Sequence, residues 1–273
     1  MKKVILAVVI FAAVLSVVVL KCKCISISNS VTTSQGSVNN AYILESRRQN
    51  LFDYLRNRKD KSALSEIAEI LSLDPDDTVA LWAKGEILRR NYEFEKARVI
   101  FNKILAQQPD YAQAAISLSY IKYHERNYDE AIGLLTPLLK RKDLERENLA
   151  LAYMLLGSIN AKRASEGGLI SKVIYGTRIK NYFEKAKELG PDLAEVRLGL
   201  GTFYLLAPAI IGGASDKAIE ELKYAIKLAP DFATPHARLA QAYKEIGDPD
   251  NYNFYLNRAL QLDPENEVAK EIR

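Results

Sequence analysis

One spacing of 34 residues recurs along this chain and limits the folds open to it. It separates three pairs of like residues: Pro75 and Pro109, Ala97 and Ala131, and Pro230 and Pro264. A fixed period of about 20 to 50 residues is typical of units that cannot bury their apolar faces alone and therefore stack on neighbouring copies. The period predicts a repeat solenoid, and solenoids usually bind partners.

Within each period the apolar residues follow a helical pattern. From Glu45 onward they recur at helical spacing in short blocks, and proline-containing turns such as Asp74-Pro75-Asp76 separate the blocks. No useful length of sequence alternates apolar and polar residues, as an exposed strand would. We therefore expect an all-α fold.

Each unit resembles the tetratricopeptide repeat, a pair of packed helices. The second unit carries the pattern at Leu81, Gly85, Leu88, Ala97, Phe101 and Pro109. Small residues at Gly85 and Ala97 let two helices cross closely. Phe101 is expected to fill the gap between units, and Pro109 to end the second helix because it lacks an N–H. The resemblance implies a right-handed α-solenoid of about six helix pairs over residues 45–273.

The resemblance also places a groove for a protein partner. In this family, positions 2, 5, 9, 12 and 13 of each first helix line the concave face, because they share one side of the helix. Carried over to the second and third units, the pattern gives Val79 and Gln113 together with the eight residues taken as the groove: Trp82, Glu86, Arg89, Arg90, Ile116, Tyr120, Tyr123 and His124. Aromatic and arginine side chains are frequent hot spots of interfaces. Packing between repeats is the competing interpretation of Trp82 and Tyr120.

Two adjacent units are longer than the period. Pro109 and Pro191 are 82 residues apart where two periods take 68, and Pro230 follows 39 residues later. The surplus predicts insertions near 161–178 and 205–214, each between the two helices of its unit. Insertions at one place in neighbouring repeats often form a binding face. A ligand pocket is therefore one alternative, lined by Leu169, Ile170, Pro208, Ile210, Ile211, Gly212 and Gly213. Packing of the insertions on each other or on a membrane is the other.

Residues 1–24 predict an export signal or a single hydrophobic membrane-anchor helix. Val4 to Leu20 is a run of 17 residues without a charge, flanked by lysines. As a helix it would be about 26 Å long, enough to span most of a ~30 Å hydrocarbon layer. Cleavable signals have a shorter apolar core of about 7 to 15 residues, so an uncleaved anchor is favoured and cleavage stays open.

Residues 25–44 predict a flexible polar linker, because Ser, Thr, Asn, Gln and Gly dominate and no charged residue occurs there. We expect the folded part to lie outside the cytoplasm, in the periplasm or at the cell surface if the source is bacterial. Cys22 and Cys24, the only cysteines, directly follow the apolar run. The folded part therefore has no disulfide and no thiolate metal site, and the role of these two thiols stays open.

Composition and motifs argue against other function classes. The 38 basic and 34 acidic residues are interleaved and leave a net charge of +4, so no nucleic-acid partner is expected. The two histidines are far apart, with His236 expected in the core and His124 at the surface. Phosphate-binding loops, nucleophile elbows and metal motifs are missing from the sequence, which predicts neither an enzyme nor a cofactor or metal.

These features predict a non-enzymatic scaffold, membrane-tethered or exported, that binds a protein partner through its concave groove. Self-association is left open. The alternative is a periplasmic helper that binds a small apolar ligand or a solute-binding protein. It arises because the element from Pro208 to Gly213 loosely resembles periplasmic tetratricopeptide proteins of tripartite (TRAP-type) transport systems.

Overall fold

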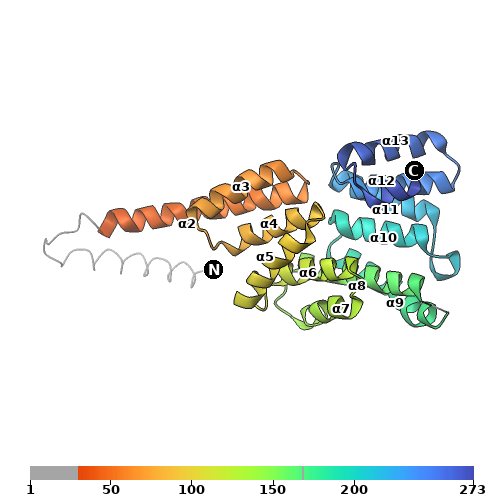
Figure 1. Ribbon diagram of the computed structural model, residues 1–273, viewed down its shortest axis with the longest axis horizontal. Helices are drawn as coiled ribbons and strands as arrows, with labels where there is room; N and C mark the ends of the chain where they lie inside the picture. Colours follow the sequence, from red (N-terminus) through yellow and green to blue (C-terminus); the bar gives the residue numbers. More distant parts are fainter. Residues whose placement is uncertain (1–29, 168) are drawn as a thin grey trace, which may run out of the picture. The chain divides into compact units, whose positions relative to one another are not determined.

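The computed structural model describes residues 30–167 and 169–273, with side chains described outside 30–40 and 169–177. The described residues form α-helices and two short 3-10 helices, without a β-strand, which confirms the all-α prediction (Figure 1). The chain divides into two units at Ser46 and Arg47. Everything that follows concerns the second unit, unless stated otherwise.

Consecutive helices of this unit pack as pairs. The later pairs are α4 (Thr78–Arg90) with α5 (Phe94–Gln107), α6 (Ala112–His124) with α7 (Tyr128–Leu135), α8 (Arg146–Glu166) with α9 (Leu169–Leu189), α10 (Ala194–Leu206) with α11 (Ser215–Leu228), and α12 (Ala233–Glu245) with α13 (Pro249–Leu262). They are preceded by α2 (Ser30–Arg56) and α3 (Asp60–Leu73), and α14 (Glu267–Ile272) follows. Two 3-10 helices, η2 (Leu138–Lys140) and η3 (Ala209–Ile211), lie in connections. The first helices α4, α6, α8, α10 and α12 contact one another in that order, so they share one face.

Close helix crossings explain the small residues of the repeat. A Cβ atom on Gly85 would lie 2.6 Å from the ring of Phe101, and one on Gly157 would lie 3.0 Å from the ring of Phe183. In the unit between them Ser119 replaces the glycine, and its hydroxyl donates to the carbonyl oxygen of Ala131 at 2.9 Å. The predicted place of Gly85 at a helix crossing is thus confirmed. Phe101 also packs in one core cluster with Ala114, Leu118 and Ile121 of the next unit, which confirms its predicted place between units.

The turn between the two helices of a pair has a recurring left-handed residue. Arg58, Tyr92 and Arg126 have φ values of 57°, 61° and 61° and follow each other at 34-residue spacing. Gly247, with φ of 76°, has the same place in the last pair. In each turn the next N–H bonds back to the carbonyl five residues earlier, for example Lys59 to Tyr54 at 2.9 Å. This bond satisfies a helix-end carbonyl.

The first insertion differs from its predicted form. The extra residues near 161–178 lengthen α8 and α9 to 21 residues each, so the second helix begins at Leu169 and little connecting loop remains. A longer helix satisfies its own backbone hydrogen bonds, which an equally long loop would not. The second insertion, 205–214, does form a connection and contains η3.

The N-terminal boundaries also differ from expectation. Helix α2 begins at Ser30, so residues 30–44 are helical where a flexible linker was predicted. The stretch contains no proline, and each residue added to an existing helix gains a hydrogen bond at low cost. The apolar run from Val4 to Leu20 lies outside the described residues, so the anchor stays a prediction. Within the described part of the chain no helix is both long and apolar enough to cross a membrane.

Candidate functional site

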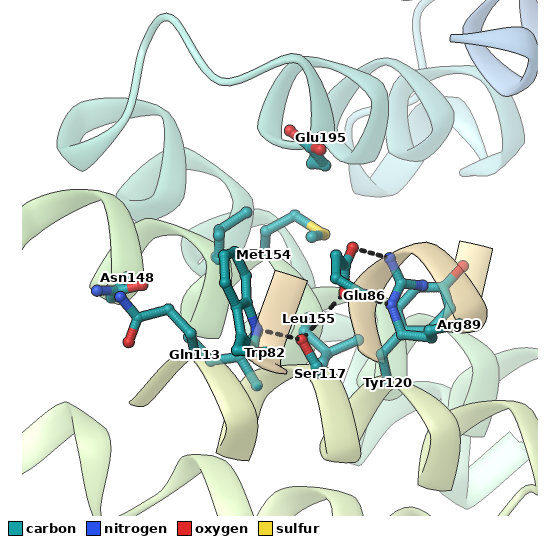
Figure 2. Close-up of a pocket in the computed structure, with 12 residues that line it drawn as sticks. Trp82, Glu86, Arg89, Gln113, Ser117, Tyr120, Asn148, Met154, Leu155 and Glu195 are labelled. Atoms are coloured by element: carbon teal, nitrogen blue, oxygen red, sulfur yellow. Dashed lines mark hydrogen bonds and ion pairs between the residues drawn. The ribbon is translucent and has the colours of Figure 1, made fainter. Parts of the chain in front are cut away.

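A pocket of about 100 Å³ lies on the face shared by the first helices (Figure 2). Its lining comes from α4, α6, α8 and α10: Trp82, Glu86, Arg89, Gln113, Ile116, Ser117, Tyr120, Asn148, Leu151, Met154, Leu155 and Glu195. Four successive helix pairs thus contribute to one pocket. Its space suits roughly three water molecules at ~30 Å³ each, or one small apolar side chain.

Apolar side chains form the wall around Trp82. Ile116, Leu151, Met154 and Leu155 lie on the two helices that follow α4 along this face. The indole N–H of Trp82 donates to the hydroxyl of Ser117 at 3.2 Å, which fixes the ring at the pocket edge (Figure 2). A fixed aromatic ring loses little conformational freedom when a partner packs on it.

A buried carboxylate joins this wall to two arginines. Arg89 donates from Nε to Glu86 at 2.8 Å, and Arg90 donates from its own Nε to the same carboxylate at 3.2 Å. The hydroxyl of Ser117 donates to Glu86 at 3.1 Å, and the guanidinium of Arg89 lies 4.0 Å from the ring centre of Tyr120. Each charged group of the cluster is therefore paired.

The pKa values reflect this pairing. Burial alone would raise the pKa of the Glu86 carboxyl, but the charges of Arg89 and Arg90 outweigh it and lower that pKa from 4.5 to about 2. Burial would lower the pKa of Arg89, yet Glu86 raises it instead. Both groups stay ionised over the physiological range, so the cluster is a fixed charge pattern and is not poised to transfer protons.

The eight predicted groove residues divide into two sets. Five of them line the pocket: Trp82, Glu86, Arg89, Ile116 and Tyr120. Arg90 instead reaches α2 and α3, where it donates to the carbonyl of Leu55 and to Asp60, both at 3.1 Å. Their role in binding a partner stays a prediction.

Tyr123 and His124 form an aromatic cluster beside the pocket. The ring of His124 is 4.6 Å from that of Tyr120 and 5.3 Å from that of Phe94, centre to centre. The sequence predicts His124 at the surface because it lies at the end of a helix. The structure instead places it half-buried in this cluster. Burial, followed by the charge of Arg89, lowers its pKa to about 4. His236 is buried as predicted, and its Nε2 is 2.9 Å from the carbonyl oxygen of Pro230.

Sequence reasoning missed the residues contributed by α8 and α10. Leu151 and Met154 precede Gly157 by six and three residues, as Val79 and Trp82 precede Gly85. Glu195 likewise precedes Gly201 by six residues. Counting the groove positions back from the glycine at each helix crossing would have identified Leu151, Met154 and Glu195. Ser117 is outside that pattern, and its role as a bridge follows only from the packed structure.

The alternative ligand pocket between the insertions is not tested by these contacts. The side chains of Leu169 and Ile170 lie outside the described set. Of the others, Ile210 is 93% exposed and Ile211 is 41% exposed. Gly212 adopts φ of 111°, and a Cβ there would lie 3.6 Å from Lys180, so the second insertion packs beside α9. Among the described residues no cluster of His, Cys, Asp and Glu is placed to hold a metal ion.

Comparison with known proteins gives sequence relatives and structural neighbours. No protein-family model matches the chain. The tetratricopeptide repeat and J domain-containing co-chaperone DNJ1 of Fusarium oxysporum is 24% identical over 226 residues, which is 80% of this chain and 40% of DNJ1. The chain therefore spans about two fifths of that relative.

Two solved structures show the same architecture. The thermophilic tetratricopeptide protein TTC0263 of Thermus thermophilus matches with a TM-score of 0.58 and 20% identity, covering 71% of this chain and 96% of that one. A human IFIT1 dimer with m7Gppp-AAAA matches with a TM-score of 0.59 and 14% identity, covering 84% of this chain and 52% of that one. At these identities the likeness establishes the tetratricopeptide-type fold, and it says nothing further about activity.

Proposed function

We propose that this chain is a non-enzymatic scaffold that binds a protein partner by taking one apolar side chain of that partner into the Trp82 pocket. The observation that carries the proposal is the pocket itself, in which Trp82 and three aliphatic residues surround a space of about 100 Å³. Free ligands usually occupy larger pockets of about 300–1,000 Å³, whereas a single anchoring side chain fits this space.

The polar rim supports a protein partner rather than a fully enclosed ligand. Gln113 and Asn148 border the apolar wall on one side, and Glu195 of α10 also lines the pocket (Figure 2). Apolar centres with polar rims are typical of interfaces between proteins. In the proposed arrangement the segment from Val4 to Leu20 tethers the scaffold to a membrane, with the folded part outside the cytoplasm.

Panning a random-peptide display library against the full chain tests this function. Selected peptides are titrated while the fluorescence of Trp82, the only tryptophan, is recorded. We expect them to share an apolar residue and to shift the emission of Trp82. Leu151→Phe, which fills the pocket, should weaken binding at least about tenfold, whereas Val99→Ala on the exposed face of α5 should not. Equal binding to both variants would place the partner elsewhere.

A further inference from the structure

Two residues in strained turns reach from the early helix pairs to the late ones. Arg58 and Tyr92 hold the left-handed conformation for which the last pair uses Gly247. Side chains other than glycine are uncommon in that conformation. Such residues persist where the surrounding contacts hold them, and these contacts often serve a function.

Arg58 joins the end of α2 to the second half of the unit. Its guanidinium pairs with Glu195 on α10, and it lies 3.9 Å from the ring centre of Phe232, the residue before α12. Only 11% of the Arg58 side chain is exposed. The neighbouring Arg56 pairs with Glu147 of α8 at 3.2 Å. One short turn thus contacts three later parts of the unit.

Tyr92 makes the same kind of connection one repeat later. Its hydroxyl lies near Glu267 of α14, and its side chain stays 39% exposed. Burial, with the charges of Asp263 and Glu267, raises the pKa of Tyr92 to about 12. Arg126, the third residue of the series, differs because its ion pair, at 3.5 Å, is with Glu166 of the adjacent pair.

Two features of the contact between Arg58 and Glu195 favour its opening. Its Nε is buried and has no hydrogen-bond partner among the described residues. Burial and the nearby charge of Arg90 lower the pKa of its guanidinium to about 10, against the opposite effect of Glu195. A buried donor without a partner and a neighbouring like charge both weaken the closed arrangement.

We propose that Arg58 and Tyr92 form a clasp that holds the concave face closed, and that a partner reaches the Trp82 pocket when this clasp opens. Glu195 couples the two, because it lines the pocket and also pairs with Arg58. The consequence for a partner rests on the proposed function. The closure itself does not, since it is measurable on the protein alone.

The test is the accessibility of Trp82 in the full chain carrying Arg58→Gly and Tyr92→Gly. Glycine suits the backbone of both turns, so the change removes the clasp contacts without adding strain. Arg126→Gly is the matched control, because it relieves an equivalent turn whose arginine pairs with Glu166 of the adjacent helix pair. We expect the acrylamide quenching constant of Trp82 to rise at least about twofold in the double variant and to stay unchanged in the control, because opening shifts the population toward an accessible pocket.

Equal quenching in the wild type, the double variant and the control, with helix content retained in circular dichroism, would overturn the clasp. If the double variant loses helix content, Glu195→Gln replaces it, because that change leaves both turns intact. Unchanged quenching in Glu195→Gln would then overturn the proposal. Peptide binding can fail while quenching still rises, so this result and the test of the proposed function are independent.

Discussion

Glu86 and Glu221 are both buried carboxylates that pair with two basic side chains, but the partners come from different places. Glu86 pairs with Arg89 and Arg90, three and four residues later on its own helix. Glu221 on α11 pairs with Lys187 of α9 and with Arg197 of α10, the latter at 2.7 Å. The first cluster is local in sequence, and the second joins three helices of two adjacent pairs.

This difference separates a site from a structural connection. The charges of Glu86, Arg89 and Arg90 come together as soon as α4 forms, and the neighbouring pairs then add the contacts with Ser117 and Asp60. The Glu86 carboxylate therefore contributes less to the stacking of repeats than Glu221 does, and it can shape a binding surface. The charges around Glu221 meet only when the repeats have stacked. Removing one carboxylate should therefore have a large effect on stability at Glu221 and a smaller one at Glu86.

The largest effect is expected for Glu221→Gln. The change leaves Arg197, whose side chain is 13% exposed, without its carboxylate, and Lys187, at 39% exposed, loses less. We expect the free energy of unfolding to fall by about 3 kcal/mol, because an uncompensated buried charge is costly. Urea denaturation followed by circular dichroism measures it.

Glu188→Gln is the control for that measurement. Glu188 pairs with Lys185 on the same helix and is 64% exposed, so its loss should cost far less stability than the loss of Glu221. If the two variants lose equal stability, the Glu221 pairs do not hold the repeats together.

Gly85→Ala should come next and tests packing, not charge, beside Glu86. The added Cβ would lie 2.6 Å from the fully buried ring of Phe101. Overpacking of this kind should cost about 2 kcal/mol, measured from the same denaturation curves. Gly133→Ala is the control, since a Cβ there meets nothing within 4 Å and should stabilise the helix by up to about 1 kcal/mol. A loss of stability in both variants would show that helix crossings are not the cause.

Glu86→Gln should cost about 1 kcal/mol at neutral pH, because its two charged partners share its helix and keep other contacts, and the glutamine can still accept from Ser117. The wild-type carboxyl has a pKa lowered from 4.5 to about 2. Its contribution is therefore present above pH about 4.5 and is lost as the pH falls toward about 2. Urea midpoints of both proteins across that range should converge. A constant difference at all pH values would contradict the assigned ion pairs.

The smallest effect is expected for His124→Phe. The lowered pKa of His124, about 4 against 6.5, means that the unfolded chain binds more protons between these values. Its contribution to stability is present above pH about 6.5 and is lost as the pH falls to about 4. The variant should flatten part of the stability profile in that window, while His236 keeps its own dependence. If the stability profiles of the wild type and the variant superimpose, the charge of Arg89 does not act on His124.

The regular units were the most predictable part of the protein. The repeat pattern predicts Gly85 at a helix crossing and Phe101 in the gap between units, and five of the predicted groove residues line one pocket, because the neighbours of all these residues lie within one or two repeats. The form of the first insertion was not predictable in this way. Spacing between prolines gives the number of extra residues, but it does not say whether they extend the helices or form a loop.

By itself, the sequence determined the helix pairs, their order and the small residues at their crossings. These features depend on contacts within about one period, which the 34-residue spacing encodes. Only the tertiary structure decided that Arg58 meets Glu195 and Phe232, 137 and 174 residues away. Such contacts depend on small rotations added from one repeat to the next, together with the lengthened α8 and α9. A local pattern of residues does not specify that sum.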